Sequence, residues 1–262
     1  MRDSAREARH TGDRPPADAD QHSEEIGVGY TGDVTVAGPS DLRVLDEVEV
    51  RKLAVGPSGN NAYLLTCRRS GAQLLVDAAA EPDRLLELVR DGSPTARLDL
   101  VVTTHRHLDH IGALASIEAT TGAQLAAGAP DVDAITEATG VGISRPLHDG
   151  DTIVLGHLTI EVIALRGHTP GSVTLVYREP EHASAPGAVP GRAHLFTGDS
   201  LFPGGVGSTS NDPERFAQLY ADVTTRLFDR FDDATWVYAG HGADTTLGAE
   251  RPHLDEWRER GW

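Results

Sequence analysis

The feature that most constrains this chain is a strongly apolar run that ends in a cluster of histidine and aspartate. Residues 98–103 read LDLVVT, which predicts a buried strand, and residues 104–110 read THRHLDH. His105 and His107 are two apart and point the same way in extended backbone, while Asp109 and His110 follow at the turn into a predicted helix. Imidazole and carboxylate groups bind zinc, and ordinary packing does not require three histidines and an aspartate here. The segment therefore predicts a metal site.

Three further candidate ligands share this context, because each follows a predicted strand and is preceded by a glycine. They are His168 after residues 158–165, Asp199 after residues 194–197, and His241 after residues 236–239. Glycine permits a tight bend and a close approach of the backbone to a bound group. Strand ends at one edge of a sheet converge in space. We therefore expect all the candidate ligands to meet in one cleft.

The remaining pattern predicts two packed sheets with helices outside. Strands are expected near residues 48–55, 63–67, 73–77, 153–155 and 173–177. Helices are expected from residue 81, over 111–120, over 130–138 and over 212–228. Residues 179–192 contain several proline, glycine and alanine residues, which predicts a mobile surface loop.

The N-terminal part differs in composition from the rest. Residues 1–32 are rich in Asp, Glu, Arg, Ala and Pro, which predicts a disordered tail, and residues 33–262 are expected to form one domain. The N-terminus lacks the apolar core of a secretory signal, and no apolar run approaches a membrane span. We therefore expect a cytoplasmic protein that does not bind a membrane.

Charge and cysteine content exclude other classes of function. The formal net charge is -17 at pH 7, which would repel a phosphate backbone, so no nucleic-acid partner is expected. Cys67 is the single cysteine, so no internal disulfide and no multi-cysteine metal site can form. Because it lies within a predicted apolar strand, we interpret it as a buried packing thiol.

Four motifs together resemble the metallo-β-lactamase superfamily: THRHLDH, GHTPGS, TGDSLF and AGH, in that order, within a region from about Val44 to the C-terminus. The resemblance implies an α+β fold, a four-layer αβ/βα sandwich. It implies one metal held by His105, His107 and His168, a second held by Asp109, His110 and His241, and Asp199 bridging both. Two divalent ions are expected, zinc in the first place, with iron or manganese as alternatives.

The implied chemistry is hydrolysis. Two cations hold a shared hydroxide, which attacks a carbonyl carbon, and a metal stabilises the resulting oxyanion. Asp109 is the candidate catalytic residue, since it can transfer a proton to the leaving group. The expected partner is a small-molecule substrate, and the expected state is a monomer or a homodimer.

The segment AGHGADTTLGAERPHL resembles the short bacterial glyoxalase II-like hydrolases, which cleave thioesters of small thiols. Two departures widen the substrate prediction to a thioester, an ester or a lactone. The segment after His241 is too short for the helical domain with which full-length glyoxalase II grips glutathione. Residues 207–210 are GSTS where such proteins often have Gly-Arg-Thr-Asp. The alternative is a persulfide dioxygenase, in which His105, His168 and Asp199 would hold a single iron.

Three other features are expected near the cleft. Asp77 ends a predicted strand and is expected to orient a ligand rather than bind metal. Asn61 lies in a predicted turn, from which it can reach the cleft. The glycine-rich residues 202–207 are expected to form a mobile wall of the cleft.

Overall fold

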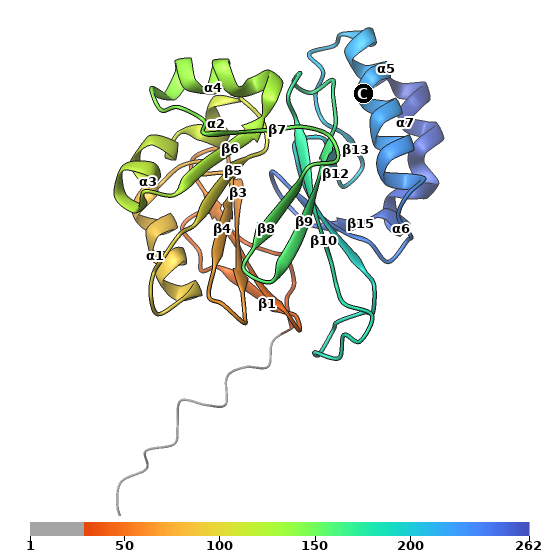
Figure 1. Cartoon of the computed structure of the whole chain (residues 1–262). Coiled ribbons are helices and arrows are strands. Elements are labelled where there is room, and N and C mark those ends of the chain that lie inside the picture. The colour runs from red at the N-terminus through yellow and green to blue at the C-terminus, as the bar shows by residue number, and fades with distance from the viewer. Residues whose placement is uncertain (1–28, 262) are drawn as a thin grey trace, which may run out of the picture.

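The computed structural model describes residues 29–261, in which two sheets lie face to face with helices on their outer sides (Figure 1). The first sheet contains, in spatial order, β1 (Asp41–Val44), β2 (Val48–Val55), β3 (Asn60–Cys67), β4 (Gln73–Val76), β5 (Leu100–Thr103), β6 (Gln124–Gly128) and β7 (Arg145–Leu147). Strands β1 to β4 pair antiparallel, and β4 to β7 pair parallel.

The outer face of the first sheet is covered by short helices. These are α1 (Pro82–Gly92), α2 (Leu108–Ile111), α3 (Leu114–Thr121) and α4 (Val132–Thr139), the last preceded by a 3-10 turn over Ala129–Asp131. Pro82 occupies the first turn of α1, where its missing N–H costs no hydrogen bond. Leu85, Leu88 and Val89 of α1 are buried against the sheet, together with Leu114 of α3.

The second sheet follows the first along the chain. Its spatial order is β15 (Thr245–Thr246), β14 (Trp236–Ala239), β11 (Ala193–Gly198), β10 (Val173–Arg178), β9 (Leu158–Ala164) and β8 (Thr152–Leu155). The β11–β14 pair is parallel and the others are antiparallel. A small hairpin, β12 (Leu201–Phe202) with β13 (Gly205–Val206), lies beside it.

Helices also cover the outer face of the second sheet. They are α5 (Pro213–Val223), which continues into a π-helical turn over Thr224–Phe228, α6 (Leu247–Glu250) and α7 (Leu254–Arg260), the last two joined by a 3-10 turn over Arg251–His253. Trp257 of α7 is 1% exposed and packs edge-on against Phe228. This tryptophan therefore belongs to the core of the domain.

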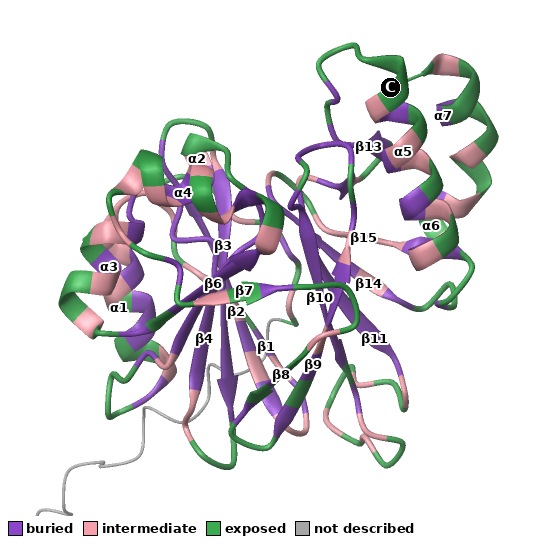
Figure 2. Ribbon diagram, turned by 45° about the horizontal axis from the view of Figure 1, so that its top comes forward, coloured by how far each residue is buried: buried purple, intermediate pink, exposed green. Residues whose placement is uncertain are grey.

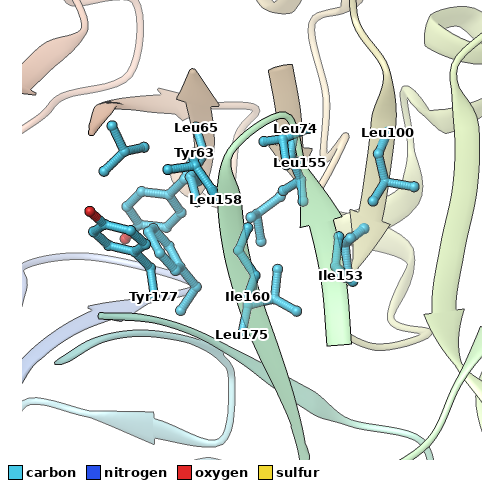
Figure 3. Packing of buried hydrophobic residues seen from close by; sticks show 14 of the residues in the cluster. Tyr63, Leu65, Leu74, Leu100, Ile153, Leu155, Leu158, Ile160, Leu175 and Tyr177 are labelled. Carbon is cyan, nitrogen blue, oxygen red and sulfur yellow. The ribbon is translucent and has the colours of Figure 1, made fainter. Parts of the chain in front are cut away.

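An apolar layer lies between the two sheets and holds them together. Leu65 and Leu74 from the first sheet pack in the same cluster as Ile160 and Leu175 from the second (Figure 3). Figure 2 shows the strands largely buried and the helices exposed on their outer sides. The four-layer order of helices, sheet, sheet and helices confirms the predicted α+β sandwich.

Some elements differ from the sequence-based expectation. The helix expected over 111–120 is two helices, because the N–H of Ala113 bonds to the carbonyl of Ala78 instead of continuing the first. Gly112 passes so close to the first sheet that a Cβ would lie 2.7 Å from the carbonyl oxygen of Ala79. Strand β6 was not expected, because its sequence QLAAG lacks the β-branched residues typical of strands.

The expected tail, residues 1–32, lies for the most part outside the described residues. Its last few residues contact the domain: the Tyr30 ring packs edge-on against Trp236, and the N–H groups of Thr31 and Gly32 donate to Asp41. Among the described residues, packing on the domain thus extends back to Tyr30, a single aromatic residue without the periodic neighbours that make a pattern visible. No helix within residues 29–261 has both the length and the apolar character that crossing a bilayer requires.

The loop over residues 179–192 is fastened to the first sheet. The carboxylate of Asp46, in the turn between β1 and β2, accepts from the N–H groups of Ser184 and Ala185, each at 2.9 Å. The Arg192 guanidinium closes the loop by donating to the carbonyl oxygen of Gly187. These bonds oppose the mobility that the length of the loop predicts.

Candidate metal centre

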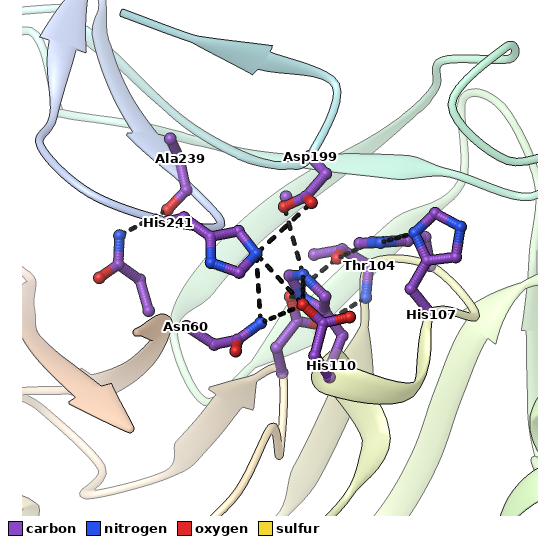
Figure 4. Close-up of polar contacts among 12 residues, drawn as sticks. Asn60, Thr104, His107, His110, Asp199, Ala239 and His241 are labelled. Atoms are coloured by element: carbon purple, nitrogen blue, oxygen red, sulfur yellow. Dashed lines mark hydrogen bonds and ion pairs between the residues drawn. The ribbon is translucent and has the colours of Figure 1, made fainter. Parts of the chain in front are cut away.

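All seven candidate ligands meet at one edge of the sandwich. His105 and His107 follow β5, Asp109 and His110 lie in α2, His168 follows β9, Asp199 follows β11, and His241 follows β14. Three groups of side chains each bring their ligand atoms within 4.8 Å of one another: His105, His107 and His168; His105, His110 and Asp199; and Asp109, His110 and His241. The cluster thus takes residues from both sheets (Figure 4).

The first group, defined as His105, His107 and His168, brings three ring nitrogens together. Nε2 of His105 lies 3.0 Å from Nδ1 of His107 and 3.2 Å from Nε2 of His168. Two nitrogens bound to one tetrahedral zinc ion at about 2.0–2.1 Å lie about 3.3 Å apart. The spacing of the first group therefore fits the ligands of a single metal ion.

The second group, defined as Asp109, His110 and His241, is more open. Nε2 of His241 lies 3.4 Å from Oδ2 of Asp109, and Nε2 of His110 lies 4.0 Å from the same oxygen. Asp199 stands between the groups: its Oδ1 is 3.2 Å from His110 Nε2, and its Oδ2 is 3.8 Å from His168 Nε2. Its Oδ2 also lies 3.5 Å from His241 Nε2, so Asp199 faces both groups.

Neighbours outside the cluster orient the rings. Three of the histidines have Nδ1 next to an acceptor: His168 at 2.8 Å from the Ser208 carbonyl, His110 at 2.8 Å from Asp77 Oδ2, and His241 at 3.2 Å from the Ser58 carbonyl. When the ring is neutral, as metal binding requires, an Nδ1–H that donates to such an acceptor leaves the lone pair on Nε2, which points into the cluster. Metal-binding histidines are held in this way.

Two atoms at the centre are buried without a hydrogen-bond partner, Nε2 of His110 and Oδ1 of Asp199. They lie 3.2 Å apart, yet their geometry does not meet that of a hydrogen bond. Buried polar atoms are nearly always paired, so such a pair calls for an explanation. A cation bound by both atoms would satisfy them.

The charges favour a cation at this centre. Burial lowers the pKa of His105 well below its usual value, which leaves that ring neutral and able to bind metal. Burial also acts on His110, but the carboxylates of Asp77 and Asp199 outweigh it and raise the pKa of His110 to about 10. Although burial opposes it, the neighbouring His110 and His241 hold the pKa of Asp199 well below its usual range. Positive charge beside Asp199 is therefore stabilised.

Asp77 orients two parts of the cluster, in the manner expected for it. Its carboxylate accepts from the Thr104 N–H at 2.7 Å, from the Thr104 hydroxyl at 2.8 Å, and contacts His110. The Thr104 hydroxyl is in turn 3.0 Å from Nδ1 of His105. Asp77 itself has a φ of 59°, a left-handed conformation that is costly for a residue with a side chain and recurs at functional sites.

Two residues that contact the ligand segments were not expected. Asp131, at the end of the turn after β6, accepts from the Arg106 N–H at 3.1 Å, from the Thr169 hydroxyl at 2.6 Å and from the Gly171 N–H at 3.0 Å. It therefore ties the segment of His105 and His107 to the segment of His168. Strand β6 ends in Gly128, but Asp131 follows three residues later and no histidine accompanies it, so the sequence does not mark it as part of the site.

The second is Asn60, whose amide is 3.1 Å from Asp109 Oδ2 and 3.3 Å from His241 Nε2. Asn61, the residue that was expected to reach the cleft, instead donates to the backbone carbonyls of Ala239 and Gly242. Strand β3 begins at Asn60, earlier than the pattern predicts, and side chains alternate along a strand, so Asn60 and Asn61 point to opposite faces.

Glycine before a ligand is required at Gly240, as the sequence suggests. A Cβ there would lie 2.1 Å from Asp199 Oδ1 and 2.9 Å from His110 Cε1. The glycine-rich residues 202–207 form the β12–β13 hairpin, and the Phe202 ring lies 6.4 Å from the His241 ring. The Gly204 N–H donates to the Glu250 carboxylate, and the Arg260 guanidinium donates to the Gly204 carbonyl, so both ends of the Gly204 backbone are held.

Cys67 has an apolar environment, unlike the residues of the cluster. It is 0% exposed and belongs to the apolar layer between the sheets. The prediction of a buried packing thiol is confirmed.

Several known proteins are similar to this chain. The hydroxyacylglutathione hydrolase GloC of Haemophilus influenzae is 26% identical over 196 residues, which is 68% of this chain and 83% of the relative. The solved structure of ETHE1 from Myxococcus xanthus has a TM-score of 0.63 and 27% identity, covering 80% of this chain and 84% of that one. The solved structure of TTHA1623 in a di-iron-bound form has a TM-score of 0.59 and 31% identity, covering 76% and 96%.

The family model described as the metallo-beta-lactamase superfamily matches residues 55–241. That span contains the whole cluster, from the segment after β5 to His241 after β14. The order of its motifs, the four-layer fold and this match agree, and the chain belongs to the metallo-β-lactamase superfamily.

Proposed function

We propose that this protein is a dinuclear metal-dependent hydrolase that cleaves a thioester, an ester or a lactone of a small molecule. The observation that supports this most is the position of Asp199 between the two groups. Its Oδ2 lies 3.8 Å from His168 of the first group and 3.5 Å from His241 of the second, and its Oδ1 lies 3.2 Å from His110 of the second. A carboxylate placed in this way can bridge two cations, and two-cation sites of this kind assist hydrolysis.

Each residue has a proposed role in holding the metals. The first group would hold one cation, the second group would hold the other, and Asp199 would contribute to both. Zinc suits these nitrogen and carboxylate ligands, with iron or manganese as alternatives. When bound, two such cations supply a hydroxide nucleophile at neutral pH and polarise the carbonyl that is attacked.

Asp109 is the proposed catalytic residue. Its side chain is 40% exposed, so it reaches solvent, while its Oδ2 accepts from Asn60. Burial opposes ionisation, but the Asn60 bond and the nearby His110 lower the pKa of Asp109, which keeps it ionised. An ionised carboxylate here can take up a proton from the incoming water and pass it to the leaving group.

The substrate class is supported by the relatives. The Haemophilus influenzae relative is named a hydroxyacylglutathione hydrolase, and it is matched over 83% of its length. We propose a small acyl thioester as the first substrate to test, with esters and lactones as the other members of the class. The leaving thiol is then the product to measure.

The test is a substrate panel on protein whose metal content is measured by elemental analysis. We expect close to two divalent ions per chain and release of free thiol from acyl thioesters, detected with a thiol reagent. A panel of lactones and esters tests the rest of the class. One iron per chain, with oxygen uptake on glutathione persulfide, would contradict the proposal and support a persulfide dioxygenase.

A further inference from the structure

A fully buried lysine contacts the segment that directly follows His241 of the second group. Lys52, in β2 of the first sheet, has a side chain that is 0% exposed. Its Nζ donates to three acceptors: the Gly32 carbonyl at 2.6 Å, the Gly242 carbonyl at 2.8 Å and Asp244 Oδ1 at 2.8 Å. An ammonium has three N–H groups, so Lys52 is fully paired.

Its partner, Asp244, is equally well paired. The carboxylate is 2% exposed and accepts from Lys52, from the Tyr30 hydroxyl at 2.6 Å and from the Trp236 indole N–H at 2.9 Å. Replacing a buried ion pair by apolar residues is often neutral or stabilising. Stability alone therefore does not account for a charged pair at this position.

The pair acts directly on the segment of His241. Gly242 follows this ligand, and its carbonyl oxygen accepts from both Lys52 and the Asn61 amide, at 2.8 and 3.0 Å. Asp244 lies two residues further along the same segment, between β14 and β15. Lys52 therefore holds the segment at two points just after the ligand.

The bonds of Lys52 connect the first sheet to the segment that carries His241, a member of the second group. Asp109 and His110 follow β5 of the first sheet, whereas His241 follows β14 of the second. The distance between their ligand atoms depends on how the sheets are held together here. Lys52 binds the segment of His241 from the first sheet. The Asn61 N–H does the same by donating to the Gly240 carbonyl at 2.7 Å, and both bonds restrict that distance.

The N-terminal segment completes this arrangement. Tyr30 and Gly32 precede the first strand, yet one donates to Asp244 and the other accepts from Lys52. The Tyr30 ring also packs against Trp236 and Tyr238 at centroid distances of 6.2 Å. Residues that composition assigns to a tail thus supply part of the pairing beneath a candidate ligand.

We infer that the Lys52–Asp244 pair, completed by Tyr30 and Gly32, positions His241 to bind the second cation. The inference rests on the proposed two-cation site but not on the substrate. Lys52 and Asp244 are positioning residues, because they act through the segment of His241.

The test measures cation binding rather than turnover. Full-length protein is stripped of metal and titrated with Co²⁺, with bound metal measured by equilibrium dialysis and ligand geometry followed by visible absorption. In Lys52→Met the first Co²⁺ should bind as in the wild type. The affinity for the second should fall by about 10-fold, the lower end of the 10- to 100-fold range for losing a group bonded directly to a ligand, because Lys52 acts through the backbone.

Two further variants separate positioning from stability. Tyr30→Phe keeps the ring and removes one bond to Asp244, so it should weaken the second Co²⁺ in the same direction by a smaller factor. Arg192→Met is the matched control, because Arg192 is also a buried cation in an ion pair, 2.7 Å from Glu179 and away from the cluster. It should lower the melting temperature and leave both Co²⁺ affinities unchanged.

The results can overturn the inference in separate ways. A folded Lys52→Met that binds the second Co²⁺ as tightly as the wild type contradicts it, and so does a wild type that binds a single Co²⁺. If Lys52→Met does not fold by circular dichroism, an unchanged second affinity in Tyr30→Phe contradicts it. Protein that binds two Co²⁺ as expected but hydrolyses no thioester, ester or lactone contradicts the proposed function alone.

Discussion

Strand β11 has a buried polar cluster at each end, and the two clusters differ in how their atoms are paired. At its start, His194 has Nε2 2.9 Å from Glu179 and Nδ1 3.0 Å from the Tyr238 hydroxyl. Glu179 also accepts from Arg192 at 2.7 Å. Just past its end, Asp199 Oδ1 and the facing Nε2 of His110 are buried without a hydrogen-bond partner.

The difference shows what distinguishes a structural histidine from a ligand. Both clusters are buried and both combine histidine with carboxylate, so neither burial nor residue type separates them. At the start of β11 each ring nitrogen of His194 has a complementary partner, and the network is complete. At the other end the ring nitrogens of His105, His107 and His168 face one another, an arrangement that suits the ligands of a cation.

The largest expected effect comes from removing a ligand of the first group. His168→Ala should lose one cation per chain, and thioester hydrolysis should fall by more than the roughly 100-fold upper range for losing an outer partner. Circular dichroism should show the fold retained. Undiminished turnover would mean that the unpaired cluster is not the active site. Unpaired buried atoms would then not distinguish a catalytic cluster from a structural one.

The second prediction concerns the paired cluster and pH. Burial chiefly lowers the pKa of His194 to about 4, whereas an unfolded histidine titrates near 6.5. As pH falls from about 6.5 to 4, the unfolded chain binds the proton first, so stability is lost across this window, by roughly 3 kcal/mol. Metal-free protein should show this loss in urea unfolding, and His194→Gln should show a correspondingly smaller one.

Equal losses of unfolding free energy in the wild type and in His194→Gln would contradict this account. The comparison between the two proteins removes the contribution of carboxylates that do not contact His194. Glu179 acts in the same direction: burial opposes ionisation, but its bonds with His194 and Arg192 lower its pKa, so its contribution is also lost on acidification.

The smallest expected effect tests the close approach at the metal edge. In Gly240→Ala the new methyl group would lie 2.1 Å from Asp199 Oδ1, so the segment of His241 must shift. We expect a loss of about 1–3 kcal/mol in unfolding free energy, with a lowered metal content. Gly142→Ala is the control, because its Cβ would meet nothing within 4 Å. Retained metal content in Gly240→Ala would show that the approach is not needed.

The positions of the candidate ligands could be predicted from the sequence because their signals are local. The string from His105 to His110 follows one apolar strand, and His168, Asp199 and His241 each follow a glycine at a strand end. Strand period and glycine chemistry are enough to place them at one edge of the sheets.

The supporting residues could not be predicted, because their partners are distant in the chain. Lys52 and Asp244 are 192 residues apart, and Asp131 joins segments that belong to different sheets. A lone lysine in a strand has the appearance of a solvated charge, and a lone aspartate in a turn has a local explanation. Only the packing of one sheet on the other brings such residues together.

The order of the two sheets along the chain has a consequence for synthesis of the protein. All seven strands of the first sheet precede every strand of the second. A growing chain therefore completes one half of the sandwich first, with the apolar face that includes Leu65 and Leu74 uncovered until the second half emerges. Exposed apolar faces of this kind favour aggregation. The interval between the two halves is thus the stage of biogenesis at which a chaperone would matter most.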